Sequence, residues 1–422
     1  MMPNVRSTYT DAVGFFGLTS PTELVETYGS PLYVYSEAIL RQRCREMKAL
    51  SSHPGFRVNY SAKANSNLAL LHIIREEGLV VDAMSPGELF MNLRAGFSPD
   101  QILYVCNNVS AEELGNAVSH GLLVSVDSLS QLDLYGEVNP GGRVMVRFNP
   151  GIGAGHHKKV VTAGKETKFG VDPASIDEVR TILARHNLTL AGINQHIGSL
   201  FLEPESYVEA ARFLLTLAER FDDVEVIDFG GGFGIPYHKY DSQRRLDLAA
   251  MGAQFDDLIS GWAHRRGYRG RFLVEPGRYV VAECGLLLGS VHSVKSNGAN
   301  RYVGTDLGFN VLARPVMYDA HHDIEVYRED GEPSGLLLPQ TVVGNICESG
   351  DIIAKNRPLP PVEEGDILGV LDAGAYGYVM SSSYNQRMRP AEVLIDLEGR
   401  PRLVRRRETL DDLVVMYEGL GL

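Results

Sequence analysis

The chain has 422 residues, of which 44% are hydrophobic and 22% are charged, so it is suited to two or three folded domains and is neither disordered nor fibrous. Acidic residues outnumber basic ones by 53 to 40, and the net charge of −13 argues against a nucleic-acid partner, because phosphate backbones bind basic surfaces. No apolar run has the length of a membrane span, and the first residues lack a signal-peptide pattern. Four cysteines without a CxxC pair predict neither a disulfide framework nor a metal site. Together these features predict a cytoplasmic globular enzyme.

The first thirty-odd residues predict a short helix at 21–29 and a strand at 31–35, which can pair with either of two later domains. From residue 56 to about 281, strand-like runs alternate with amphipathic helical stretches. Eight such runs occur, at 57–63, 80–85, 102–106, 122–128, 143–149, 190–199, 224–232 and 272–278. Eight β/α repeats of this size predict a (β/α)8 barrel, with a doubly wound open sheet as the alternative.

After residue 282 the pattern changes to short strand-like runs without intervening helices, which predicts an all-β domain. A hairpin is expected to turn at 398–400. A short helix is expected to begin at Leu410, with Thr409 as its N-cap.

Polar and reactive side chains gather where the eight predicted barrel strands end, and barrels of this type build their active sites there. They are Lys63, Asp82, Ser85, Asn107, Asp127, Asn149, His196, the glycines 230–232, Glu275 and Arg278. Lys63 shares a strand face with Asn59 and Ser61, so it is predicted to face the barrel mouth, where desolvation makes a lysine a Schiff-base nucleophile. The alternative is a surface lysine at the start of a loop.

The other residues of this group suggest what the lysine binds. Three glycines at 230–232, with Ser199 and Arg278, form a candidate phosphate cup, although a tight turn also explains the glycines. Glu275 is a candidate to keep a pyridine nitrogen protonated, the alternative being an ion pair with Arg278, and His196 is a candidate to stack on a ring. Lysine, phosphate cup, carboxylate and imidazole are the groups that pyridoxal 5′-phosphate requires, so this cofactor is predicted.

Eight motifs make the sequence resemble the diaminopimelate decarboxylases, a family within the alanine-racemase-like (fold type III) pyridoxal-phosphate decarboxylases. They are YSAKAN (60–65), VDAMSPGEL (81–89), HIGS (196–199), GGGFG (230–234), EPGRYVV (275–281), RPVMY (314–318), CESGD (347–351) and GAYGY (374–378). The resemblance implies a pyridoxal-phosphate (β/α)8 barrel at 37–282 and a Greek-key-like β domain formed by 1–36 and 283–422. It also implies a homodimer with shared active sites and a small amino-acid substrate.

Carried over residue by residue, the resemblance implies a role for each matching position. Lys63 forms the internal aldimine, with Asp82 and Glu88 nearby, and His196 stacks on the ring. Ser199, Gly231, Gly232, Gly277, Arg278 and Tyr376 hold the cofactor with Glu275, which pairs with the pyridine nitrogen. Cys347 and Glu348 enter the site from the other subunit, and the Cys347 thiol returns a proton to the carbanion. The implied substrate contacts are Arg278, Arg314, Tyr318, Glu348 and Tyr376.

Charge at the distal end of the substrate favours decarboxylation of meso-2,6-diaminopimelate to L-lysine. That end carries a carboxylate and an ammonium, and Arg314 with Tyr318 matches the first while Glu348 matches the second. Related decarboxylases of D-ornithine, D-lysine or carboxynorspermidine, a non-catalytic pyridoxal-phosphate carrier, and racemase-like chemistry are the alternatives. The glycine- and lysine-rich stretch 151–170 is either a lid over the site or an ordinary surface loop.

Overall fold

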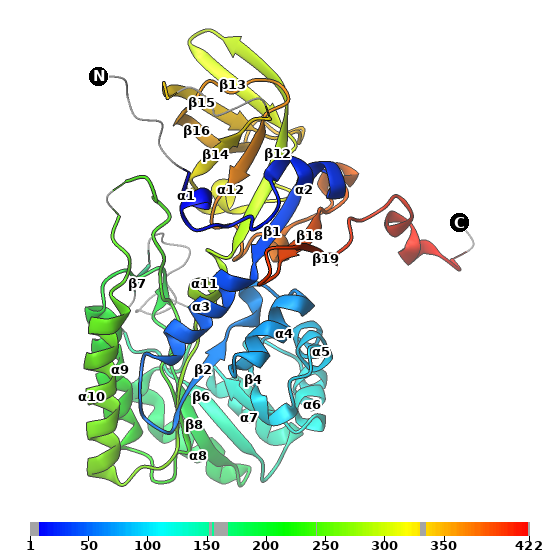
Figure 1. Ribbon diagram of the computed structural model, residues 1–422. Coiled ribbons are helices and arrows are strands. Elements are labelled where there is room, and N and C mark those ends of the chain that lie inside the picture. The colour runs from blue at the N-terminus through cyan, green and yellow to red at the C-terminus, as the bar shows by residue number, and fades with distance from the viewer. Residues whose placement is uncertain (1–7, 152–153, 156–167, 242, 330–334, 421–422) are drawn as a thin grey trace. The chain divides into compact units, whose positions relative to one another are not determined.

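The computed structural model describes residues 8–151, 154–155, 168–241, 243–329 and 335–420 (Figure 1). It divides into two compact units. The first, here called the β unit, comprises Met1–Leu40, Tyr237–Gln243 and Val281–Leu422. The second, the barrel unit, comprises Arg41–Pro236 and Arg244–Val280. Most of the stretch 151–170, for which a lid is one hypothesis, lies outside the described residues.

The barrel unit contains a closed barrel of eight parallel strands, which excludes the open-sheet alternative and confirms the predicted (β/α)8 architecture. Neighbouring strands follow the order β10-β11-β2-β3-β4-β5-β6-β8 around the barrel. Their bounds are β2 Phe56–Tyr60, β3 Val80–Ala83, β4 Ile102–Val105, β5 Leu123–Val126, β6 Arg143–Arg147, β8 Thr189–Asn194, β10 Val226–Asp228 and β11 Arg271–Val274. A separate two-stranded pair joins β7 (Ala154–Gly155) to β9 (Gly198–Ser199).

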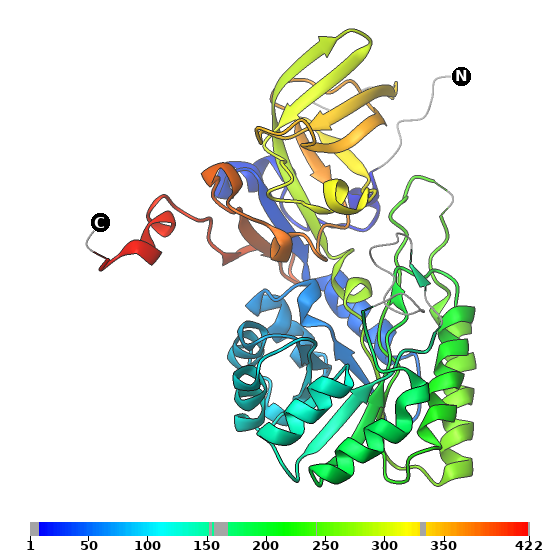
Figure 2. The same ribbon diagram turned by 180° about the vertical axis from the view of Figure 1, so that it is seen from behind.

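Helices lie around the outside of these strands, as Figures 1 and 2 show. They are α3 Glu37–Lys48, which begins in the β unit, α4 Leu68–Glu76, α5 Pro86–Arg94, α6 Ala111–Ser119, α7 Leu129–Val138, α8 Ile176–Arg185, α9 Glu205–Ala218, α10 Leu248–Arg266 and α11 Arg278–Val281. Four of them begin shortly after a strand at a capping side chain that accepts a first-turn N–H: Asn67, Ser85, Ser110 and Ser128. These caps start the helices close to the strand ends and keep the loops short.

The interior of the barrel changes character along its axis. Leu103, Val105, Met145, Val226 and Leu273 form an apolar cluster of buried side chains. Nearer the carboxyl ends of the strands the inward residues are polar, and Ser125 Oγ donates to Asn194 Oδ1 at 2.8 Å. A dry core therefore supports a polar layer at the end where barrel enzymes place their chemistry.

The β unit is built on a nine-stranded sheet, in agreement with the predicted all-β domain. Its strands are β1 Leu32–Ser36, β12 Gly285–Asn297, β13 Asn300–Thr305, β14 Ile324–Tyr327, β15 Leu338–Val343, β16 Ile352–Leu359, β17 Ile367–Val370, β18 Ala391–Ile395 and β19 Pro401–Arg405. The N-terminal β1 is antiparallel to β12 and parallel to β18, so the N-terminal segment belongs to this sheet (Figure 1). Helices α1 Tyr9–Ala12, α2 Pro21–Tyr28 and α12 Arg314–Tyr318 complete the unit.

Three local predictions can be compared with the β unit. The hairpin between β18 and β19 turns at 398–400, where Gly399 adopts a positive φ of 78°. The helix predicted from Leu410 is instead two short 3-10 turns, Asp411–Leu413 and Val415–Tyr417. Residues 237–243, placed in the barrel by the predicted boundaries, group with the β unit. None of the helices in the described ranges has both the length and the apolar character needed to cross a membrane.

Candidate active site

Lys63 lies at the carboxyl end of the barrel, in a turn rather than in a strand. Strand β2 ends at Tyr60, and Ala62–Ala64 form a 3-10 turn with the half-buried Lys63 at its centre. The prediction that the strand reaches residue 63 is therefore wrong. The chain leaves the sheet because the Ser61 N–H donates to the Pro276 carbonyl at 3.1 Å and the Ala62 N–H donates to Asp82 Oδ1 at 2.9 Å.

Two carboxyl groups stand near this lysine. Asp82, 1% exposed, lies one residue before the end of β3. Burial raises its pKa to about 8 although the charge of Lys63 lowers it, and the charge of Glu275 raises it further. Glu88 of α5 accepts the Met84 N–H at 2.7 Å, and burial raises its pKa although Lys63 lowers it. The Lys63 charge acts on both carboxyl groups, so the amine faces an acidic neighbourhood.

His196 follows β8 and is held as a neutral imidazole. The Gly231 N–H donates to His196 Nδ1 at 3.1 Å, so Nδ1 carries no proton. Burial lowers the pKa of His196 well below its usual value, and the charges of Lys63 and Arg147 lower it further. Glu275 Oε2 lies 3.9 Å from the same Nδ1, but a neutral ring forms no ion pair with it. The ring is therefore flat, uncharged and fixed by the backbone of the glycine segment.

The three glycines 230–232 are required by close backbone contacts. A Cβ on Gly231 would lie 2.0 Å from the Glu275 carbonyl oxygen, and one on Gly232, at φ +109°, would lie 2.7 Å from the Gly198 carbonyl oxygen. Gly277 is similar, because its Cβ would lie 3.0 Å from that of Ala64 in the Lys63 turn. The glycines thus let the strand ends that carry His196, Glu275 and Lys63 approach one another.

Ser199 and Arg278 form a polar pair in the barrel unit. Arg278 opens α11, is 6% exposed, and donates from its terminal guanidinium nitrogen to Ser199 Oγ at 3.0 Å. A guanidinium beside a hydroxyl is suited to an anion such as a phosphate. The sequence assigned these two residues to one phosphate cup, and the structure brings them into contact.

Glu275 and Asp228 are two buried carboxyl groups at the ends of neighbouring strands. Burial raises the pKa of Glu275 well above its usual value, and Asp228 raises it further. Burial also raises the pKa of Asp228 to about 6, although this carboxyl accepts the Gly230 N–H at 2.9 Å. Glu275 is 5% exposed, and its side chain is hydrogen-bonded to that of Asp228. A buried carboxyl group that holds a proton is suited to a hydrogen bond with a ring nitrogen.

The β unit contributes a second set of predicted residues. Arg314 opens helix α12, is 2% exposed, and donates to His322 Nε2 at 2.7 Å. Tyr318 ends the same short helix and is half-buried. Tyr376 lies between β17 and β18 with a positive φ of 55°, a strained conformation for a residue with a side chain.

Cys347 and Glu348 lie on an exposed turn between β15 and β16. Cys347 is exposed, whereas Cys44, Cys106 and Cys284 are buried. Asn385 holds Cys347 from two sides: its Oδ1 accepts the Cys347 N–H at 3.1 Å, and its Nδ2 donates to Sγ at 3.3 Å. Tyr384 donates to Glu348 Oε1 at 2.7 Å. Both side chains are thus oriented while remaining exposed on this chain.

Comparisons with known proteins agree with the geometry of the site. Residues 37–282 match the family model described as pyridoxal-dependent decarboxylase, pyridoxal binding domain. The diaminopimelate decarboxylase of Methanothermobacter thermautotrophicus is 42% identical over 408 residues, covering 94% of each chain. The diaminopimelate decarboxylase of Escherichia coli is 34% identical over 99% of each chain. The chain belongs to the diaminopimelate decarboxylase family.

A solved structure supports the same family. Diaminopimelate decarboxylase from Helicobacter pylori, complexed with L-lysine, has a TM-score of 0.86 at 31% identity and covers 96% of this chain and 100% of that chain. Family membership makes the protein a pyridoxal-phosphate-dependent decarboxylase.

The residues of the barrel unit fit pyridoxal 5′-phosphate. The buried Glu275 carboxyl is suited to a hydrogen bond with a pyridine nitrogen, and neutral His196 presents a flat ring without charge. Ser199 and Arg278 form a contact that an anionic phosphate can join. Because the Gly231 N–H is already bound to His196, the structure gives Gly231 a role in holding that ring.

One inward-facing residue at a strand end, Arg147, was not among the residues predicted from the sequence. Arg147 ends β6, is 9% exposed, and its charge acts on Glu275, Asp127 and Asp228. Its NH2 has no hydrogen-bond partner in the described part of the chain. Alternation along β6 places Arg143, Met145 and Arg147 on one face, and this signal was available in the sequence. Asn149, the residue predicted to stand at this strand end, lies two residues beyond the end of the strand.

Proposed function

We propose that this protein decarboxylates meso-2,6-diaminopimelate to L-lysine and CO2 with pyridoxal 5′-phosphate, as the last step in making lysine. The relatives that carry this activity in their names support the proposal. The observation that carries the choice of substrate is Arg314, a guanidinium only 2% exposed. A buried guanidinium of this kind is suited to a bidentate contact with a carboxylate, so it favours a substrate whose distal end supplies one.

Residues of the barrel unit prepare the reacting end of the substrate. When bound, the cofactor supplies an electron sink for the pair released as CO2 leaves. Lys63 would hold the cofactor aldehyde through its amine, and Asp82 and Glu88 would receive or return protons at the lysine nitrogen. Glu275 would keep a proton at the pyridine nitrogen, and His196 would pack on the ring face.

Residues of both units are assigned to bind the cofactor phosphate and the substrate. Ser199, Gly232, Arg278 and Tyr376 hold the phosphate. Arg314 and Tyr318 bind the distal carboxylate, and Glu348 binds the distal ammonium. Arg278 and Tyr376 also contact the substrate.

The proton that replaces CO2 comes from Cys347 of a second copy of this chain. Two observations support this assignment: Cys347 is exposed, and Asn385 orients its Sγ. The proposal therefore includes a homodimer that shares its active sites, and it places the reaction in the cytoplasm.

The test begins with the purified protein, which should absorb visible light as a lysine-bound pyridoxal does. Borohydride reduction followed by peptide mapping should then label Lys63. Release of CO2 should be fastest with meso-diaminopimelate when L-lysine, D-ornithine and carboxynorspermidine are offered in parallel. Faster turnover of a substrate without a distal carboxylate would overturn the choice of substrate.

A further inference from the structure

His322 and Arg314 form a buried pair in the β unit. Both side chains are 2% exposed, and the terminal NH1 nitrogen of Arg314 lies 2.7 Å from His322 Nε2. On its other side, His322 Nδ1 lies 2.7 Å from the carbonyl oxygen of Leu371. A carbonyl oxygen only accepts and a guanidinium only donates, so Nδ1 must carry the proton and Nε2 must accept. These two partners together require the neutral imidazole in a single tautomer.

Tyr237 supports the same guanidinium from a second direction. Its ring centroid lies 4.7 Å from the Arg314 guanidinium carbon and 5.2 Å from the His322 ring, which meets it edge to face. A cation over a tyrosine face is attracted by the ring electrons. Because a guanidinium is planar, fixing one N–H and one face fixes the directions of its other donors.

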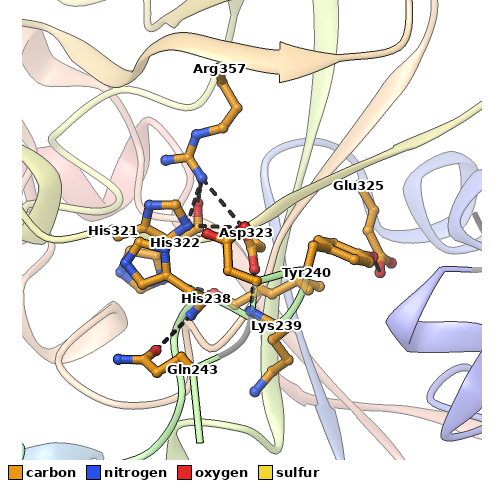
Figure 3. A network of polar contacts seen from close by, with 11 residues as sticks. His238, Lys239, Tyr240, Gln243, His321, His322, Asp323, Glu325 and Arg357 are labelled. Carbon is orange, nitrogen blue, oxygen red and sulfur yellow. Dashed lines mark hydrogen bonds and ion pairs between the residues drawn. The ribbon is translucent and has the colours of Figure 1, made fainter. Parts of the chain in front are cut away.

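Tyr237 belongs to a short segment, residues 237–241, here called the strap. Lys239 binds the strap to the rest of the β unit. The ammonium group of Lys239 lies 2.7 Å from Glu283 and 3.1 Å from Asp372. The Lys239 N–H donates to Asp323, and Tyr240 donates to Glu325. Figure 3 shows the strap residues His238, Lys239 and Tyr240 beside His321, His322 and Asp323. The strap that carries Tyr237 is therefore itself held in the β unit by buried ionic contacts.

We propose that His322 is a positioning residue for Arg314, and that the strap supplies Tyr237 as the second support. A carboxylate in place of His322 would orient the guanidinium but would also neutralise it and compete with a substrate carboxylate. A neutral imidazole orients the guanidinium without placing a negative charge beside it. The inference rests on the proposed function, in which Arg314 binds the distal carboxylate of the substrate.

The test is steady-state kinetics of the holoenzyme with meso-diaminopimelate, together with inhibition by L-lysine, which keeps the distal carboxylate, and by cadaverine, a diamine that has no carboxylate. His322→Leu removes the acceptor and should raise KM about 10- to 100-fold, the range for losing a hydrogen bond to a charged group, with kcat changed far less. Inhibition by L-lysine should weaken in parallel with KM, whereas inhibition by cadaverine should stay near that of the wild type. His322→Gln keeps an acceptor within reach of Arg314 and should recover most of the loss.

Two further variants make the result specific. His292→Leu is the control, because His292 is an exposed histidine on β12 of the same unit and lies beside Asp306, outside the strap and its anchors. It should leave KM unchanged. If His322→Leu does not fold, Tyr237→Leu tests the second support and should raise KM for diaminopimelate in the same selective way.

The outcomes separate this inference from the proposed function. Arg314→Gln should raise KM for diaminopimelate strongly, and an unchanged KM would refute the assigned role of Arg314 itself. If Arg314→Gln has this effect while a folded His322→Leu binds diaminopimelate normally, the positioning role is wrong and the proposed function stands. An equal loss of cadaverine binding in His322→Leu would also overturn the inference, because it would indicate general damage to the site.

Discussion

Three buried carboxyl groups at the barrel mouth, those of Asp82, Asp228 and Glu275, have raised pKa values in the folded chain. Burial is the largest cause of the raised pKa in each of the three groups. Each group therefore retains its proton in the native state at a pH where the same group of the unfolded chain has released it. Such an arrangement costs stability, and it is typical of active sites, where carboxyl groups are kept for chemistry.

The Asp82 pKa of about 8, compared with 3.8 for a free carboxyl, sets the sign of one prediction. Because the pKa of Asp82 is higher in the folded chain than in the unfolded chain, the native state binds the proton more tightly. The stability that this carboxyl group contributes is complete below about pH 4 and is lost as the pH rises toward 8. Asp82→Asn keeps an acceptor for the Ala62 N–H and should remove this slope. The free energy of unfolding is measured by urea titration between pH 4 and 8. Going from pH 4 to pH 8, the wild type should lose on the order of a few kcal/mol more stability than Asp82→Asn.

The exposed Asp222 provides the control for this measurement. Asp222→Asn should follow the wild-type pH dependence. A pH slope of the same steepness in Asp82→Asn would show that the buried carboxyl at the barrel mouth does not retain its proton.

The four cysteines should differ sharply in reactivity. Burial raises the pKa of the Cys44 and Cys106 thiols to about 12, and Cys284 is also buried, whereas Cys347 is exposed. The native protein should therefore show one fast-reacting thiol per chain toward an aromatic disulfide reagent, and Cys347→Ser should remove it. L-Lysine should slow this reaction if Cys347 enters an active site. Fast labelling that persists in Cys347→Ser would contradict the prediction.

At the scale of elements, the strap connects barrel strand β10 to helix α10 in sequence but is anchored in the β unit. Burial alone would lower the pKa of Lys239, but the charges of Asp372 and Glu283 outweigh it and raise the pKa above its ordinary value. Lys239 therefore stays protonated inside the β unit, between two carboxylates whose side chains are 0% and 1% exposed.

Lys239→Met should destabilise the protein by about 3–5 kcal/mol, because it leaves two buried carboxyl groups without their cation. Unfolding in guanidinium chloride measures this loss, and Lys295→Met, at an exposed position of β12, is the matched control. The triple variant that also carries Glu283→Gln and Asp372→Asn should recover part of the loss, since no buried charge remains. A loss in Lys239→Met no larger than in Lys295→Met would show that the triad contributes little.

At the scale of the whole molecule, the residues proposed for the active site come from both units of the chain. Lys63, Glu275 and Arg278 belong to the barrel unit, whereas Arg314 and Cys347 belong to the β unit. The proposed homodimer assigns Cys347 to the active site of the second copy. An assembly in which each site needs both chains is a closed, symmetric arrangement of a common kind.

Mixing two inactive variants tests this arrangement. Lys63→Ala and Cys347→Ala should each have little activity alone. After the subunits exchange, half of the dimers combine the two variants and contain one intact site of two, so activity should recover to roughly a quarter of the wild-type value. If both residues instead came from one chain, the mixture would stay inactive.

The sequence determined the repeat of strand and helix, the all-β character after residue 282 and the identities of the chemical groups. These follow from local periodicity and residue type, so the closed barrel and the residues at its strand ends could be predicted. The turn that holds Lys63 was missed, because the backbone at 61–62 bonds to Pro276 and Asp82, which are distant in sequence. Periodicity within one strand carries no record of such partners.

Only the tertiary structure decided which groups are buried together. It placed Asp228 beside Glu275, brought the Gly231 N–H to His196, and located the strap in the β unit. Burial and neighbouring charge set the protonation of a carboxyl or an imidazole, and both depend on the whole fold. The residue types were therefore readable from the chain, while their charge states were not.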